Sequence, residues 1–350
     1  MGVGGVSRFY LGANSAKGFY SLYEDFTAPE SGCYVRVIKG SPGCGKSTLM
    51  RRIGAAAEAA GLTVEYIHCS GDPDSLDGVR LPERGVCWVD GTAPHVIEPV
   101  CPGAGGDYLD MSCLLDPSLL RQRLDAMEDC TARYRALYAL AYRQLAAIAP
   151  MLPRNDPSVR EEPGLARAKR RALGLARRLP PLQKAGTVRR RFLSALSCQG
   201  VIRMTDTLAP YPQRLLLDNA LGFGNAFLCV LAEAARARGY AVTVCCDPLE
   251  PERIEAVLLP EAGLSALACD PLFLPQQPAG RRVHLESSVP AAHLRELRPR
   301  QHEAALLLDA ATDSLARAKA LHDELEGFYR GAVDFEAANR LAEREFKRYL

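Results

Sequence analysis

Long apolar runs are missing from this sequence, because charged residues interrupt each apolar stretch before the roughly 18 residues that a membrane-spanning helix needs. Residues 1–8 also lack the basic segment and apolar core that begin a secretory signal. We therefore expect a cytoplasmic protein that makes no membrane contact.

Paired metal-binding cysteines are missing too. The twelve cysteines lie far from one another in the sequence, except for the neighbours Cys245 and Cys246. No Cys-x-x-Cys pair occurs. This spacing excludes the usual structural zinc sites and gives no sign of a disulfide framework. We expect reduced cysteines, most of which pack as small apolar residues.

Acidic residues are absent from one stretch of the chain. Between Gly164 and Arg203 there are eleven basic residues and no acidic one, although the net charge of the whole chain is only +2. The stretch 167–203 is therefore a candidate contact for nucleic acid or for a protein partner. Aromatic residues that stack on bases are missing before Phe192, so a solvated helix face followed by a linker is the simpler interpretation.

An internal repeat is the main feature that the sequence does contain. At a constant offset of 178 residues, 61–66 aligns with 239–244 and 81–83 aligns with 259–261. Two copies therefore fill the chain. A boundary near Pro180 divides it into predicted domains 1–180 and 181–350.

The upstream parts of the two copies also match. Arg8 and Phe9 align with Arg191 and Phe192, and the later glycines of these segments align at an offset one residue shorter. The similarity therefore extends to the start of each copy.

Each copy has the same predicted order of elements: a β-branched strand, a glycine-rich turn, an alanine-rich helix and two more strands. The predicted strands are 33–39, 63–69 and 86–90 in the first copy, and 215–218, 241–246 and 264–269 in the second. The predicted helices that follow the turns are 46–60 and 225–238. Strands joined by crossover helices form parallel sheets, so the pattern predicts an α/β fold with two parallel-sheet domains.

Both copies then become helical. Apolar residues recur at intervals of three and four after Asp116, and Pro150 ends this segment. A counterpart runs from about residue 300 to 329, and a last helix extends to residue 350. Each domain is thus expected to carry a helical insert or appendage.

The first glycine-rich turn is a complete Walker A loop between a strand and a helix. Its residues are Gly40, Ser41, Pro42, Gly43, Cys44, Gly45, Lys46, Ser47 and Thr48. Backbone N–H groups of such a loop surround the β-phosphate of a nucleotide, and the following helix adds its positive dipole end. Lys46 is expected to contact the β- and γ-phosphates, and Ser47 to ligate Mg²⁺. Cys44, close to the helix start, is expected to be a reactive thiolate that ATP shields.

Three further residues are candidates for the chemistry. Asp90 ends an apolar strand and is expected to act on Mg²⁺ as a Walker B aspartate, although it also fits an ordinary turn. Asp72 and His95 follow neighbouring strands at the same sheet edge, where they are candidates for orienting water or an acceptor. Each of the two also fits a capping or solvated role. No glutamate follows Asp90, so the adjacent base of many ATP-driven motors is missing.

Together with the Walker A loop, the runs 69–78 and 90–95 resemble an uncharacterised bacterial family of tandem-duplicated P-loop NTPases described only as ATPases. The resemblance covers nearly the whole chain. It implies two tandem P-loop domains and ATP binding, and it implies no particular substrate.

The second loop departs from that family, whose members tend to keep a phosphate-binding loop in both halves. In a direct alignment of the two loops, four positions of the motif differ. Gly40 is replaced by Asn219 and Lys46 by Asn225. Ser47 is replaced by Ala226 and Thr48 by Phe227. The lysine charge and the magnesium-ligating hydroxyl are lost. We therefore expect one Mg-ATP site per chain, in the first half.

The sequence as a whole predicts an Mg-ATP-binding P-loop NTPase that hydrolyses ATP slowly. Two alternatives stay open. A small-molecule or nucleotide kinase would use the acidic turn near Asp72 to hold an acceptor. A nucleotide-gated binding module would bind ATP without turnover.

Overall fold

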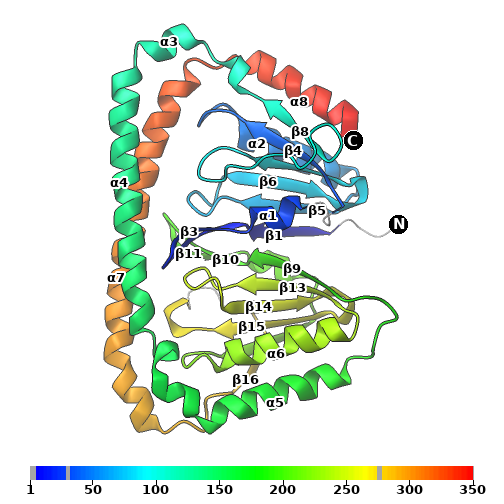
Figure 1. Ribbon diagram of the computed structural model, residues 1–350, viewed down its shortest axis with the longest axis vertical. Helices are drawn as coiled ribbons and strands as arrows, with labels where there is room; N and C mark the ends of the chain where they lie inside the picture. Colours follow the sequence, from blue (N-terminus) through cyan, green and yellow to red (C-terminus); the bar gives the residue numbers. More distant parts are fainter. Residues whose placement is uncertain (1–4, 29–31, 274–277, 350) are drawn as a thin grey trace.

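The computed structural model describes residues 5–28, 32–273 and 278–349 and has a mixed α/β architecture around one twelve-stranded sheet (Figure 1). The predicted α/β class is confirmed. The sheet runs continuously through both halves of the chain in the order β8-β4-β7-β6-β5-β1-β9-β13-β14-β15-β12-β16. The second half repeats the strand order of the first in reverse, so the two copies are related by an approximate two-fold axis between β1 and β9.

The first half supplies β1 (Val6–Tyr10), β4 (Tyr34–Lys39), β5 (Val64–His68), β6 (Leu76–Leu81), β7 (Val86–Asp90) and β8 (Gly106–Asp110). The second supplies β9 (Thr187–Phe192), β12 (Gln213–Asp218), β13 (Ala241–Cys246), β14 (Ile254–Leu259), β15 (Leu264–Cys269) and β16 (Arg281–Val283). All pairings are parallel except those of β6, those of β14 and the single central pair Tyr10–Phe192.

The prediction of wholly parallel sheets was therefore wrong at β6 and β14. Each of these strands is followed by a short turn that ends in a left-handed glycine, Gly85 at φ 59° or Gly263 at φ 57°. A turn this short reverses the chain and gives an antiparallel neighbour, since a parallel one requires a crossover connection. The repeated segments 81–83 and 259–261 are these turns.

Two small hairpins follow the central strands: β2 (Gly12–Ser15) with β3 (Gly18–Ser21), and β10 (Ser194–Ser197) with β11 (Gly200–Arg203). Ser15 and Ser197 each donate a side-chain hydrogen bond to the first glycine carbonyl of the returning strand. This equivalence corrects the upstream alignment by one residue, because Phe192 corresponds to Tyr10 and not to Phe9.

The helices are α1 (Tyr23–Thr27), α2 (Lys46–Ala59), α3 (Pro117–Arg121), α4 (Leu124–Ile148), α5 (Pro163–Arg178), α6 (Phe223–Ala237), α7 (Ala291–Arg330) and α8 (Phe335–Tyr349). Asp116 caps α3 by accepting a hydrogen bond from the Ser118 backbone N–H. The helices α4 and α7 run antiparallel along one side of the sheet and span both halves (Figure 1). None of the helices in the described part of the chain is both long and apolar enough to cross a membrane.

The last helix of each copy packs on the other copy. Ala168, Ala172 and Ala176 of α5 join the core around α6 of the second half. In return, α8 packs on the first half, where its buried Glu345 accepts hydrogen bonds from Arg36 and Trp88. The predicted domains 1–180 and 181–350 therefore exchange their last helices in the packed structure.

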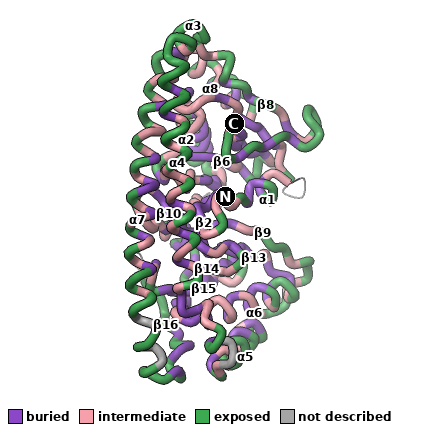
Figure 2. The backbone as a smooth tube through the Cα atoms, turned by 60° about the vertical axis from the view of Figure 1, so that its left-hand side comes forward, coloured by how far each residue is buried: buried purple, intermediate pink, exposed green. Residues whose placement is uncertain are grey.

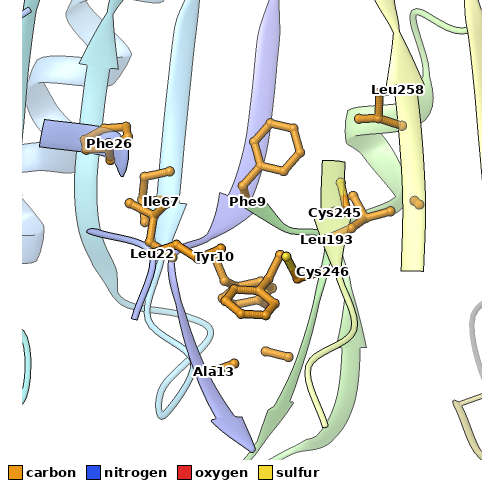
Figure 3. Close-up of a cluster of buried hydrophobic side chains, with 14 of the residues drawn as sticks. Phe9, Tyr10, Ala13, Leu22, Phe26, Ile67, Leu193, Cys245, Cys246 and Leu258 are labelled. Atoms are coloured by element: carbon orange, nitrogen blue, oxygen red, sulfur yellow. The ribbon is translucent and has the colours of Figure 1, made fainter. Parts of the chain in front are cut away.

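A shared core joins the two halves at the sheet centre. Figure 3 shows Phe9 and Tyr10 of β1 close to Leu193, Cys245 and Cys246 of the second half. Burial concentrates on the central strands, while the outer sides of α4 and α7 are exposed (Figure 2). The two halves therefore share one core, and α4 and α7 contact elements of both.

Candidate functional site

The Walker A loop lies between β4 and α2. Lys39 ends the strand, and α2 begins at Lys46. Gly43 and Gly45 adopt φ angles of 73° and 96°, a left-handed region that residues with a Cβ rarely adopt. The Cys44 backbone N–H donates a hydrogen bond to the Ser41 carbonyl oxygen at 3.4 Å, and no side chain caps the start of α2. The sequence thus forms a compact turn with N–H donors next to a helix N-terminus.

Lys46 links this loop to the neighbouring strand. Its Nζ donates hydrogen bonds to the carbonyl oxygens of Gly40 at 2.8 Å and Ser41 at 2.9 Å. The same atom lies 3.6 Å from Oδ2 of Asp90, and both side chains are mostly buried. A lysine charge held beside a carboxylate at a helix start is available to an anion that enters the loop.

Asp90 ends β7, which pairs with the loop-bearing strand β4 in register Ile38–Asp90. Its Oδ1 accepts hydrogen bonds from the backbone N–H and the hydroxyl of Thr92, at 2.9 and 2.6 Å. These bonds leave Oδ2 on the side of Lys46. Asp90 is therefore held in one orientation at the edge of the sheet where β4 ends.

Ser47 and Ser41 supply two hydroxyls. The Ser47 Oγ accepts a hydrogen bond from the Leu76 backbone N–H at 2.9 Å, which fixes it against the start of β6. The Ser41 Oγ is buried and has no hydrogen-bond partner among the described residues. A buried hydroxyl without a partner is unusual and fits a loop that is built to receive a polar ligand.

Cys44 does not have the environment of a reactive thiolate. Its side chain is fully buried among residues of the first-half core, and burial raises the pKa of its thiol. The helix N-terminus and Lys46 favour the thiolate but act against this larger effect. Cys44 is a packing residue of the loop, and the prediction of a reactive thiolate was wrong.

His95 and Asp72 occupy different surroundings. His95 is buried with Nε2 at 3.3 Å from Asp77 Oδ2, and its ring packs 4.4 Å from that of Tyr23. The Tyr23 hydroxyl donates to the same carboxylate at 2.8 Å, so the three side chains form a buried cluster. Asp72 instead lies 3.3 Å from Nζ of Lys319 on α7. The structure therefore does not join these two predicted residues in one arrangement.

Helix α7 brings residues of the second half to the first loop, which no local sequence signal predicted. A Cβ placed on Gly43 would lie 3.0 Å from the Glu326 carbonyl oxygen and 3.2 Å from Arg330 Cγ. Lys319, Glu326 and Arg330 recur at helical spacing and so share one face of α7. One side of the loop is therefore lined by α7, which presents both positive and negative side chains there.

The second loop is one residue shorter than the first. The strands before the loops correspond at an offset of 179 residues, since Ile38 pairs with Asp90 and Leu217 with the equivalent Ala268. The helices after them correspond at 178, because Asn225 contacts Ile254 as Ser47 contacts Leu76.

This register corrects the direct alignment of the loops. Gly224 stands at the position of Lys46, Asn225 at that of Ser47 and Ala226 at that of Thr48. Phe227 does not intrude into the loop but packs in the core of the second half. The lysine and the hydroxyl are still missing, and Ala268 stands at the position of Asp90.

A carboxylate of the protein occupies the backbone donors of the second loop. Glu286 accepts hydrogen bonds from the backbone N–H groups of Ala220 at 3.2 Å and Leu221 at 2.7 Å. The Asn219 side chain accepts a further bond from the Asn225 N–H at 2.9 Å. Donors that bind phosphate in a working loop are here already paired with side-chain oxygens.

Arg154, from the segment after α4, also lies against the second loop. A Cβ placed on Gly222 would lie 3.2 Å from the Arg154 Cβ. The guanidinium points inward and binds Asp247, Glu250 and Asp270 at 2.8 to 2.9 Å, with the side chain only 1% exposed.

The basic stretch 167–203 divides into two structural classes. Arg191 and Arg203 are buried and paired with Glu65 and Glu255. Basic residues on α5 are largely exposed, for example Arg167 and Arg170. The stretch is therefore not one continuous basic surface, because part of it forms internal ion pairs.

Two cavities lie away from the Walker A loop. An open, largely apolar groove of about 690 Å³ runs between α5 and α6 and includes Leu173 and Val230. A smaller one of about 250 Å³ lies beside Asp270 and His302. Among the described residues, no group of three or more His, Cys, Asp or Glu side chains is arranged to hold a metal ion.

Comparison with known proteins gives no relative: neither a family model, nor a curated protein, nor a solved structure matches this chain. The function is therefore inferred from the geometry of the first loop.

Proposed function

We propose that the chain is a tandem P-loop NTPase that binds one Mg-ATP in its first half and hydrolyses it slowly. The observation that carries the proposal is the position of Lys46, which lies between the loop carbonyl groups and Asp90 of the adjacent strand. A lysine in this position meets the β- and γ-phosphates of a nucleotide that the loop N–H groups bind.

The donor set near Lys46 suits magnesium. Ser47 and Asp90 offer a hydroxyl and a carboxylate oxygen, which are the hard ligands that Mg²⁺ prefers, and water and phosphate oxygens commonly complete its shell. The ion would neutralise phosphate charge and orient the terminal phosphoryl group. Such a site needs few protein ligands.

Hydrolysis by this site transfers the γ-phosphoryl group to water. A water oxygen forms a bond to the γ-phosphorus, the bond to the β–γ bridging oxygen breaks, and ADP leaves with the electron pair. Phosphate and a proton are the other products. No glutamate follows Asp90, and the buried His95 is paired with Asp77, so we expect turnover to be slow.

The second half is expected to pack against the first and to have no nucleotide site of its own. Its loop lacks the lysine, and its N–H donors at Ala220 and Leu221 bind Glu286. Nucleotide would have to displace a carboxylate that the fold itself holds at the loop.

A nucleotide-gated switch is the second candidate, because α7 contacts Gly43 and also runs along the second half. A small-molecule or nucleotide kinase is the remaining alternative, in which the acidic turn near Asp72 would hold an acceptor. Turnover distinguishes these functions: ADP forms without an acceptor for an ATPase, only with one for a kinase, and not at all for a switch.

Calorimetric titration with ATP and Mg²⁺, followed by a phosphate-release assay, tests the proposal. The wild-type chain is expected to bind Mg-ATP and to release phosphate without an added acceptor. Lys46→Ala is expected to lose both, because it removes the charge that pairs with the phosphates.

Lys17→Ala is the matched control. Lys17 is an exposed lysine that pairs with Glu252 in the second half, so its removal changes the net charge equally without touching the loop. Unchanged ATP binding in Lys46→Ala would contradict the proposed site. Equal losses in both variants would indicate a general effect of charge.

A further inference from the structure

An arginine lies against a left-handed glycine in each of the two loops. Gly43 of the first loop and Gly222 of the second have φ angles of 73° and 79°. A Cβ on either glycine would lie 3.2 Å from an arginine side-chain carbon, that of Arg330 in the first loop and of Arg154 in the second. Each arginine comes from the other copy of the repeat.

The two arginines differ in how they are held. Arg154 is 1% exposed and pairs with three buried or half-buried carboxylates through Nε and one terminal nitrogen, so its charge is neutralised inside the fold. Arg330 is 65% exposed, and its one ion pair with a described residue is with Glu326, one helical turn away on α7, at 2.8 Å. An exposed ion pair at this spacing is weak, so the Arg330 guanidinium can exchange partners at little cost.

We propose that Arg330 is the arginine that contacts the γ-phosphate of ATP in the first loop, supplied by the second half of the chain. On ATP binding its guanidinium leaves Glu326 and binds the phosphate oxygens, which bring a denser negative charge than one carboxylate. The inference rests on the proposed function and adds to it a group from α7.

The position of Arg330 explains how its contact with the γ-phosphate assists hydrolysis. Its stem lies on Gly43, in the loop that faces the phosphates, and its guanidinium has the planar donors that bind phosphate with two hydrogen bonds. Charge shifts towards the β–γ bridging oxygen and the equatorial oxygens as the γ-phosphoryl group transfers. A guanidinium at that point stabilises the transition state more than the bound ATP.

The same contact connects the nucleotide to α7. Arg330 is the last residue of that helix, and α7 packs along α4 and reaches the second half. Loss of the γ-phosphate returns Arg330 to Glu326, so the end of α7 reports which nucleotide is bound.

The experiment compares Arg330→Ala with the wild-type chain in two measurements. The first is kcat for phosphate release, with the Kd for ATP measured in parallel. The second is the Kd for ADP with and without aluminium fluoride, which mimics the transferring phosphoryl group. We expect Arg330→Ala to lower kcat on the order of a thousandfold, to keep the Kd for ATP within a fewfold, and to lose the tightening by aluminium fluoride.

Arg317→Ala is the matched control, since Arg317 is 63% exposed on α7 and pairs with Asp313 at the same spacing. It is expected to behave as wild type, and Arg330→Lys to recover only part of the loss because lysine lacks the planar donors. If Arg330→Ala keeps both the wild-type kcat and the tightening, the assignment of Arg330 is wrong and the proposed function stands. If the wild-type chain itself binds no Mg-ATP, the proposed function fails and this inference fails with it.

Discussion

Arg191 of β9 donates a hydrogen bond from Nε to Glu65 of β5 at 2.8 Å, with the two side chains 1% and 3% exposed. Burial alone would raise the pKa of Glu65, but the charges of Arg191 and Arg189 outweigh it and lower this pKa to about 2. The pair joins the two halves beside the central strands, where only Tyr10 and Phe192 are paired directly between β1 and β9.

Removal of Arg191 is expected to destabilise the whole molecule. Arg191→Met leaves the Glu65 carboxylate buried without its closest partner and should lower the free energy of unfolding by about 3–5 kcal/mol. Urea unfolding monitored by circular dichroism measures this. Arg189→Met, which removes a half-exposed arginine 4.0 Å from the same carboxylate, should cost about 1 kcal/mol or less.

A double variant separates the lost pair from lost packing. Adding Glu65→Gln to Arg191→Met removes the unpaired charge and should restore part of the stability. If Arg191→Met unfolds at the same urea concentration as Arg189→Met, the pair does not hold the halves together.

The second loop should make stability depend on pH through Glu286. Burial, the largest effect, raises the pKa of this carboxyl to about 7 from its usual 4.5, although two backbone N–H groups act in the opposite direction. The folded protein therefore holds this proton more tightly than the unfolded chain. The stabilisation is fully present below pH 4.5 and is lost as the pH rises through 7.

Glu286→Gln tests this dependence. The amide cannot titrate, so the stability of the variant relative to wild type should increase between pH 4.5 and 8, by roughly 3 kcal/mol at most. Thermal unfolding of both proteins across this range gives the difference, because other titrating groups cancel. A constant difference would show that Glu286 has an ordinary pKa.

Cysteine labelling tests the structure of the Walker A loop. Cys101 and Cys113 are exposed, whereas Cys44 is buried and its pKa is raised by burial. Brief treatment with iodoacetamide should label the two exposed residues first and leave Cys44 unlabelled with or without Mg-ATP. Peptide mapping by mass spectrometry decides it, and early labelling at residue 44 would restore the reactive-thiolate hypothesis.

The number of nucleotide sites is expected to be one per chain. The second loop has Gly224 in place of Lys46, and Glu286 binds its donors at Ala220 and Leu221. Calorimetric titration of the wild-type chain and of Glu286→Ala should both give a stoichiometry near one for Mg-ATP, because removing the carboxylate does not restore the lysine. A value near two in wild type would assign a working site to the second loop.

Much of the fold was predictable because its signals are local. The repeat, the strand before the Walker A loop and the helix after it follow from residues close together in the sequence, and the structure has them within a few positions. The antiparallel strands β6 and β14 were missed, since a short turn through Gly85 or Gly263 decides the direction of the next strand. Helix α7 begins at Ala291, earlier than expected, although Pro299 lies within it.

The candidate site was predictable only where one segment supplies it. The nine residues 40–48 identify their loop without any tertiary information. Asp72 pairs with Lys319, and His95 pairs with Asp77. Cys44 packs in the first-half core. The residues next to each of the three in the sequence do not indicate these contacts. Burial reversed the expectation for Cys44, because the cost of a buried charge exceeds the effect of a helix end.

The sequence by itself determined the loop, the repeat and the loss of lysine from the second copy, because these depend on which residues follow one another. The tertiary structure alone decided that the copies share one sheet, that they exchange α5 and α8, and that Arg330 lies on Gly43 while Glu286 fills the other loop. These contacts join residues far apart in the chain. Their energy comes from burying apolar surface and pairing buried charges, which depends on the packed arrangement and leaves no fixed spacing in the sequence.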